Sequence, residues 1–383
     1  MMRKRFGIWP TYSAECRREV DKLLRRGGSL SAYRSNREYP VGPSDGSWAW
    51  RLERHAEAMF SATHVIVCSS GTMALQAALH ALNLPAGSEV VTTPFTFSAT
   101  VAAVVRAGLV PVFADVDAWG CLDPAKARRA MTKHTTAILP VDLFGRAVAN
   151  QFAGLGVPVL EDACQAVGGW STASDRSAGR LGTIGVWSFN GAKNVPAGEA
   201  GAVVTDSDAL AQRARLYVSH GENFAWDKVS ESPRDTPWLV TGVNGRINEI
   251  TACVAYHGLI RVLERNQKRR QLAAVLQQRL GGHRKLTLPD TTGHALYVYP
   301  FLLSSIVSRR LFAGKLRKAG IEIGEGYIVP PLHAYPAFRR CQRGPLPVAE
   351  TLSAQTLCLL TQVRPPATEA DMHYIADTIE AAL

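Results

Sequence analysis

Long apolar segments are missing from this chain of 383 residues. No apolar run is long enough to cross a membrane, so we expect no transmembrane helix and no membrane partner. The amino-terminal stretch MMRKRFGIWPTYSAEC carries positive charges without an apolar segment behind them, which argues against a secretory signal. The expected location is therefore the cytoplasm.

Paired cysteines and nucleotide-binding signatures are missing as well. The seven cysteines are an odd number and include no C-x-x-C pair, so neither a disulfide framework nor a zinc site is predicted. The P-loop pattern is absent, and no G-x-G-x-x-G follows a predicted strand. These absences argue against ATP and dinucleotides as ligands.

Positive charge is abundant, because 43 lysines and arginines outnumber 32 acidic residues and give a net charge of +11. One interpretation is nucleic-acid binding. The other is that basic pairs are spread along solvated helices. We favour the second, since no aromatic ladder or helix-turn-helix signature accompanies the pairs, and we expect no nucleic-acid partner. A positive field would also suit a substrate that carries phosphates.

Short β-branched runs alternate with amphipathic stretches between about residues 60 and 220. This rhythm predicts an α/β fold with three layers, in which helices cover both faces of an open, mostly parallel sheet. The runs 184–189 and 202–205 have no helix between them, which predicts an antiparallel pair and a mixed sheet. The predicted strands are 64–67, 89–93, 110–113, 136–139 and 157–160, and the predicted helices are 73–82, 96–107 and 124–131.

The chain changes character after residue 221. Residues 221–245 are rich in Pro, Asp, Asn and Gly and predict an irregular loop. We expect a large domain over 1–245, including an amino-terminal arm, and a smaller α+β domain over 246–383. The second part should contain a long linking helix with an apolar stripe, a strand over 296–303, a helix over 308–319 and a final helix; the stripe consists of Ile247, Ile250, Val254 and Leu259.

A turn of small residues, Cys68 to Leu75, directly follows the first predicted strand. A helix that begins there presents free N–H groups and the positive end of its dipole, which suits a phosphate. Gly71 would let the backbone come close to that group. Capping of the helix by Ser or Thr explains the same residues, and the turn alone does not decide between the two.

Two charged residues occupy unusual positions. Asp162 follows a buried strand, where α/β sheets place their ligands, and it could either pair with a protonated ring nitrogen or cap a following helix. Lys193 stands in a Gly-rich loop between two apolar strands. Most single lysines are solvent-exposed, but this setting is unusual for a charge that only meets water.

Six segments, in this order, resemble the sugar aminotransferases of the DegT/DnrJ/EryC1/StrS family. The likeness covers nearly the whole chain. Two positions depart from the family pattern: Ala200 replaces a usual Gly and Val167 a common His, and neither change removes a group that the cofactor chemistry needs. The segments are Ser69–Leu75 (S-S-G-T-x-A-L), Thr96–Thr100 (T-F-x-A-T), Glu161–Ala166 (E-D-A-x-Q-A), Ser188–Thr205 (S-F-x-x-x-K, then G-E-G-G-A-V-V-T), Gly242–Ile250 (G-x-N-x-R-M-x-E-I) and Pro331–Phe338 (P-L-H-x-x-P-A-F).

The resemblance implies a fold of aminotransferase type I and pyridoxal 5'-phosphate as cofactor. Lys193 would hold the cofactor as a Schiff base and shuttle a proton. Asp162 would keep the pyridine nitrogen protonated, so that the ring can accept electrons. The remaining cofactor contacts would be a ring stack by Phe97, a hydrogen bond from Gln165 to the ring hydroxyl, and phosphate contacts from Gly71, Thr72 and Ser188.

The same resemblance implies a homodimer with shared sites and a transamination in two halves. Asn244 would reach the partner's phosphate, unless it only caps the long helix. His333 would lie near the sugar, although a loop histidine has many structural explanations. Glutamate would donate the amine, and a keto sugar on a nucleoside diphosphate would accept it.

Three alternatives compete with a keto-sugar aminotransferase. The acceptor could be a carbocyclic ketone, as in aminocyclitol biosynthesis. A dehydratase on the same fold is disfavoured, because such relatives replace the lysine by histidine. A regulatory protein without chemistry is disfavoured by the presence of both Lys193 and Asp162.

Overall fold

The computed structural model describes residues 6, 9–27, 29–31, 43–221, 241–305, 307–324, 328–359 and 366–383. The predicted loop over 221–245 therefore lies largely outside the described residues. Within them, no helix has the length and apolar character that a membrane crossing requires.

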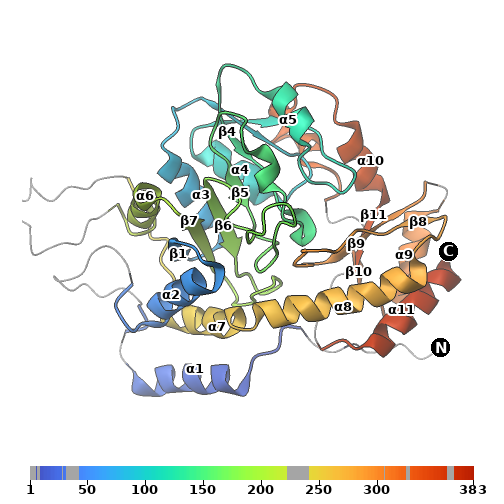
Figure 1. Cartoon of the computed structure of the whole chain (residues 1–383), viewed down its shortest axis with the longest axis horizontal. Helices are drawn as coiled ribbons and strands as arrows, with labels where there is room; N and C mark the ends of the chain where they lie inside the picture. The colour runs from blue at the N-terminus through green and yellow to red at the C-terminus, as the bar shows by residue number, and fades with distance from the viewer. Residues whose placement is uncertain are drawn as a thin grey trace, which may run out of the picture.

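A mixed, mostly parallel sheet forms the centre of the molecule (Figure 1). One part has the order β1-β7-β6-β5 and the other β3-β2-β4, and parallel bridges between β4 and the β5 segment join them. β7 runs antiparallel to both β1 and β6, which confirms the predicted antiparallel pair. The strands are β1 (His64–Cys68), β2 (Glu89–Thr92), β3 (Val110–Phe113), β4 (Thr135–Leu139), β5 (Leu160–Asp162), β6 (Ile184–Ser188) and β7 (Gly201–Thr205).

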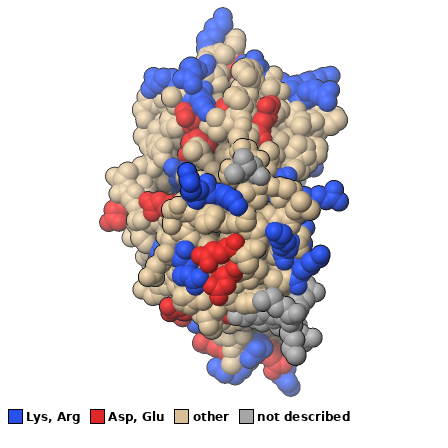
Figure 2. All heavy atoms as spheres, turned by 90° about the vertical axis from the view of Figure 1, so that its right-hand side faces the viewer, with Lys and Arg blue, Asp and Glu red and all other residues tan. Residues whose placement is uncertain are grey.

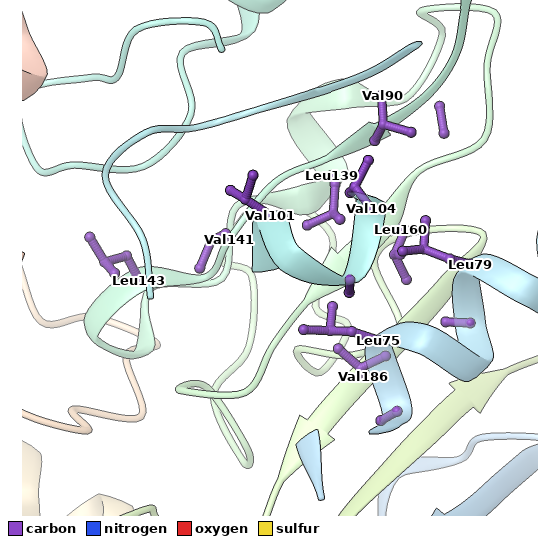
Figure 3. Close-up of a cluster of buried hydrophobic side chains, with 14 of the residues drawn as sticks. Leu75, Leu79, Val90, Val101, Val104, Leu139, Val141, Leu143, Leu160 and Val186 are labelled. Atoms are coloured by element: carbon purple, nitrogen blue, oxygen red, sulfur yellow. The ribbon is translucent and has the colours of Figure 1, made fainter. Parts of the chain in front are cut away.

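Helices cover both faces of this sheet, because its strands are apolar on both sides. In β1, Ile66 packs in one core with α3, α4 and α6, whereas Val65 and Val67 pack in another with α2 and α7. Figure 3 shows the first core, where Leu75 and Leu79 of α3 meet Val186 and other strand residues. The helices are α2 (Trp48–Phe60), α3 (Gly71–Leu82), α4 (Ser98–Arg106), α5 (Pro124–Ala130), α6 (Asp208–Val218) and α7 (Glu249–Leu259).

The predicted long linking helix is two helices, α7 and α8 (Val262–Leu280), so that prediction was wrong in this respect. The break falls at Arg261, whose backbone angles (φ −110°, ψ 3°) are not helical. The sequence indicates it only through Gly258, in the last turn of α7, which the predicted helix runs through. α1 (Ala14–Arg26) packs on α7 through one side, with Cys16 and Leu23 buried.

The carboxyl-terminal part has its own apolar core and its own sheet of order β10-β11-β9-β8. α8 runs along this part in Figure 1, and α11 packs beside it. The division at residue 245 stays a prediction. The elements are β8 (Leu286–Thr287), β9 (Tyr299–Leu303), α9 (Arg309–Lys318), β10 (Ile323–Gly324), α10 (Pro347–Gln355), β11 (Thr356–Leu359) and α11 (Glu369–Ala382).

Basic and acidic side chains are intermixed on the face that Figure 2 shows. Several basic residues lie in the last turns of helices, where positive charge meets the negative end of the helix dipole. Examples are Arg25, Arg26, Arg128, Arg129 and Lys318.

Candidate active site

The turn after β1 leads directly into α3, as its sequence predicts. The Ser70 hydroxyl accepts a hydrogen bond from Met73 N at 3.0 Å and caps the helix. A Cβ atom at Gly71 would lie 2.8 Å from Ser188 Cβ and 3.0 Å from Cys164 Sγ. Gly71 therefore lets the helix start come against the ends of β6 and β5. Thr72 is exposed beside it.

Strand register brings the lysine loop to the same edge of the sheet. Cys68 at the end of β1 pairs with Gly201 at the start of β7, and Gly201 also pairs with Ser188 at the end of β6. The loop between β6 and β7 carries Lys193, so it leaves and rejoins the sheet beside the turn before α3. Antiparallel β7 makes this possible, because it begins where its neighbours end.

Asp162 is the last residue of β5 and is 4% exposed. Its Oδ2 accepts a hydrogen bond from the Thr100 hydroxyl at 2.8 Å, and Thr100 in turn contacts the Thr96 hydroxyl at 3.0 Å. Its Oδ1 accepts from Cys164 N at 3.2 Å. A turn follows, not a helix, so the helix-cap interpretation of Asp162 was wrong. The carboxylate is held in place instead by α4.

Lys193 is partly buried, and its ammonium lies 4.1 Å from the centre of the Tyr297 ring. The next residue, Asn194, is buried and anchors the loop by donating to Ala295 O at 2.8 Å and Asn266 Oδ1 at 2.9 Å. Lys193 is therefore held by an aromatic face and a fixed neighbour and is no freely solvated surface charge.

The Cys164 thiol connects these groups electrostatically. Burial raises its pKa well above the usual value, the nearby Asp162 carboxylate raises the pKa further, and the Lys193 ammonium lowers it. Asp162 and Lys193 thus both act on one sulfur atom, which itself lies against Gly71. The three predicted motifs converge on a single place.

Gln165 and Phe97, the two predicted contacts to the cofactor ring, differ in their exposure to solvent. Gln165 is buried, and its Oε1 accepts a hydrogen bond from Phe144 N at 2.9 Å. Phe97 lies at the residue before α4 and is 63% exposed. This exposed phenyl ring, three residues before the Thr100 that contacts Asp162, offers an apolar face to a ligand.

Asn244 is exposed, and its Oδ1 accepts from Arg246 Nε at 3.3 Å. It does not cap α7. Asn248 does so, with its Oδ1 accepting from Thr251 N at 2.9 Å, and the capping interpretation of Asn244 was therefore wrong. The neighbouring Gly245 O accepts from Ser69 N at 2.7 Å, which places this segment beside the turn before α3 of the same chain.

His333 is 8% exposed and lies in a short 3-10 helix, Leu332–Ala334. Its Nε2 pairs with Glu350 Oε1 at 3.2 Å. Leu332 N donates to Pro94 O at 2.9 Å, which ties the segment to the loop that precedes Phe97. The placement is compatible with a substrate contact, which stays a prediction, as do the roles of the other site residues.

Two side chains at the site were not predicted as site residues. Thr100 lies within the T-F-x-A-T segment, but only the folded chain shows that its hydroxyl contacts Asp162. Tyr297 belongs to the predicted strand over 296–303, although β9 begins only at Tyr299. No sequence signal marks its contact with Lys193.

Comparison with known proteins identifies the class. A model of the DegT/DnrJ/EryC1/StrS aminotransferase family matches residues 43–380. A pleiotropic regulatory protein from Geobacillus stearothermophilus is 31% identical, with 87% of this chain and 89% of that protein covered. A UDP-N-acetyl-3-dehydro-alpha-D-glucosamine 3-aminotransferase from Acidithiobacillus ferrooxidans is 31% identical, with 82% and 83% covered.

Two further likenesses bear on acceptor and fold. An L-glutamine:2-deoxy-scyllo-inosose aminotransferase from Micromonospora echinospora is 32% identical, with 85% of this chain and 76% of that protein covered. The structure of the aminotransferase from Psychrobacter cryohalolentis superposes with a TM-score of 0.85 at 25% identity, and 98% of each chain is covered. The predicted family and α/β aminotransferase fold are confirmed.

Proposed function

This chain belongs to the DegT/DnrJ/EryC1/StrS aminotransferase family, and we propose that it uses pyridoxal 5'-phosphate to move an amino group from glutamate to a keto sugar on a nucleoside diphosphate. The observation that carries the proposal is the convergence of Lys193, Asp162 and the turn at Gly71 around Cys164. The turn at Gly71 suits an anionic phosphate, Asp162 suits a protonated ring nitrogen, and the Lys193 amine suits a carbonyl group.

The described residues fit this cofactor. Gly71 is the first residue of α3 and packs so closely on Ser188 and Cys164 that no Cβ atom fits there, which brings the N-terminus of α3 against Ser188 at the end of β6. Asp162 offers a buried carboxylate with fixed orientation, and Phe97 offers an exposed ring. When bound, pyridoxal phosphate supplies a carbonyl that condenses with amines and a ring that accepts electrons.

Each side chain has a distinct task in this proposal. Asp162 would hold a proton on the ring nitrogen, and Thr100 would keep the carboxylate aimed at it. Lys193 would bind the cofactor through its amine and later move a proton at the substrate carbon. The remaining contacts would be Phe97 and Gln165 at the ring, and Gly71, Thr72 and Ser188 at the phosphate.

The proposed acceptor is supported by the relative that acts on a UDP-linked 3-keto sugar. The inosose aminotransferase supports a second candidate, a carbocyclic ketone, and its printed donor is glutamine. Turnover of a keto sugar with and without its nucleoside diphosphate distinguishes the two. Absolute dependence on the diphosphate supports the first candidate, and equal turnover of a free cyclic ketone supports the second.

The shared-site dimer belongs to the proposal as well. Asn244 is exposed at the edge of the site and precedes α7, so its amide is available to a neighbouring subunit's phosphate. His333 would contact the sugar from the small domain side. The location is proposed to be the cytoplasm.

Replacement of Lys193 by Ala tests the function. The purified variant should lose the visible absorbance of the bound cofactor, resist covalent trapping by borohydride and show no transamination. Lys268→Ala is the matched control, since Lys268 is exposed on α8. A Lys193→Ala protein that still traps the cofactor covalently would refute the assignment.

A further inference from the structure

Two carboxyl groups are fully buried directly behind Asp162. Asp142 follows β4 and Glu161 lies in β5, and each is 0% exposed. Among the described residues, no Lys, Arg or His forms an ion pair with either group. Two buried anions without a cation would repel each other strongly, so the pair needs a proton.

The hydrogen bonds differ between the two carboxyls. Glu161 Oε1 accepts from Gly179 N at 2.6 Å, and its Oε2 accepts from Leu181 N at 2.7 Å and Gly182 N at 3.2 Å. These donors suit an ionised group. Asp142 Oδ1 accepts only from Val148 N at 2.9 Å.

Asp142 Oδ2 has no donor in the described part of the chain. The parallel bridge between Val141 and Asp162 places Asp142 and Glu161 on neighbouring strand segments, and the alternation of side chains turns both carboxyls to the same face. An ionised Glu161 can only accept hydrogen bonds, so it does not satisfy Asp142 Oδ2 unless one of the two groups is protonated. A proton on Asp142 Oδ2 satisfies this atom and leaves all donors to Glu161 in place.

The surrounding charges point the same way. Burial, then Glu161 and Asp162, raise the pKa of Asp142 well above its usual value. Burial also raises the pKa of Glu161, while Asp142 and the three backbone donors lower it. The buried Cys121 thiol is also close to Asp142: burial raises the pKa of this thiol, Asp117 and Asp142 raise it further, and Arg146 lowers it.

We propose that Asp142 is a positioning residue that keeps one proton and donates it to Glu161, so that the pair carries a single negative charge. Asp142 N donates to Asp162 O at 3.0 Å, and Asp142 Oδ1 fixes the turn that ends at Val148. Phe144 N, within that turn, donates to Gln165. The proton would thus hold the backbone that supports the candidate site. Only the activity measurement below rests on the proposed function.

The first experiment measures urea unfolding of the cofactor-free protein between pH 5 and pH 8. A raised pKa in the folded state means that folding takes up a proton above the unfolded pKa, so stability falls as pH rises towards the folded pKa. The unfolding constant of wild type, relative to Asp142→Asn, should grow about tenfold per pH unit in this window. Asp377→Asn, at an exposed ion pair with Arg279, should keep the wild-type slope.

Comparison with Glu161→Gln locates the proton. Its amide N–H groups would face backbone donors, so Glu161→Gln should unfold at clearly lower urea concentration than Asp142→Asn. Infrared spectra should show a protonated carboxylic acid in wild type that Asp142→Asn lacks. Equal pH slopes for wild type and Asp142→Asn, or greater stability of Glu161→Gln, would overturn the proposal.

The second experiment asks whether the pair positions the site. Asp142→Ala should lower kcat/KM on the order of tenfold, because a buried hydrogen bond to the 143–148 turn is lost. Asp142→Asn, which keeps an acceptor for Val148 N and a donor for Glu161, should restore most of this loss. If both variants lose activity equally, the pair has no positioning role, whatever the proton measurement shows.

Discussion

Gly71→Ala is expected to destabilise the protein although it replaces glycine in a helix. The added Cβ would lie 2.8 Å from Ser188 Cβ and 3.0 Å from Cys164 Sγ, closer than atoms in native cores tolerate. Ser188 ends β6 and Cys164 lies in the turn after β5, and both side chains are too short to swing away. Forced overpacking of this kind costs about 1–3 kcal/mol. The gain in helix propensity, about 0.5–1 kcal/mol in a helix interior, is smaller and is reduced at the first residue of α3.

Gly314→Ala is the matched control. Gly314 lies within α9, has helical backbone angles, and an added Cβ would meet nothing within 4 Å. Without a clash, the same substitution should stabilise the chain by about 0.5–1 kcal/mol. The two variants should therefore shift stability in opposite directions.

Urea denaturation of the cofactor-free proteins measures both shifts, provided that the slope m is unchanged. A cofactor titration adds the second readout, in which Gly71→Ala should bind pyridoxal phosphate about tenfold more weakly or worse, since the start of α3 has moved from Ser188. If Gly71→Ala is stabilised as much as Gly314→Ala and binds pyridoxal phosphate as wild type does, the close contact at Gly71 has no energetic effect and the assignment of Gly71 to the phosphate site is wrong.

Further substitutions test the carboxylate and the assembly. Asp162→Asn should weaken cofactor binding by about 1.5–3 kcal/mol and slow proton transfer severely. Thr100→Val removes only the supporting hydroxyl and should weaken binding by about 0.5–1.5 kcal/mol in a cofactor titration. Equal effects of the two variants would mean that the orientation of Asp162 matters more for binding than its charge. Mixed Lys193→Ala and Asn244→Ala subunits should regain part of the activity after exchange, because one hybrid site carries neither lesion, and a fully active monomer would contradict the shared site.

The sequence allowed prediction of elements with local signals. The apolar alternation of β1, the small residues at 69–72 and the isolated Lys193 could be interpreted without knowing their neighbours. The break at Arg261 was missed because the apolar pattern continues across it, and Gly258 in the last turn of α7 was the one local signal for it. Asn248 was missed as the cap of α7 because Asn244 stands in an equally polar stretch four residues earlier.

Contacts between distant segments were the part that sequence could not supply. The hydroxyl of Thr100 reaches Asp162 from another helix, and Asp142 meets Glu161 only because β4 and β5 lie side by side. Such contacts depend on strand order, which the alternation of elements does not determine. The same reason kept Tyr297 from being paired with Lys193.

The register at the end of β1, β7 and β6 explains which glycines the site requires. A Cβ at Gly201 would lie 2.6 Å from Gly71 N, so this strand start must be Gly for α3 to begin where it does. Ala200, one residue earlier, stands where the family usually has Gly, yet it is fully buried in the opposite core with ordinary backbone angles. Since neighbouring strand residues point to opposite faces, the methyl of Ala200 points away from the turn before α3. Ala at position 200 is therefore compatible with the proposed cofactor site, whereas Ala at position 201 would clash with the start of α3.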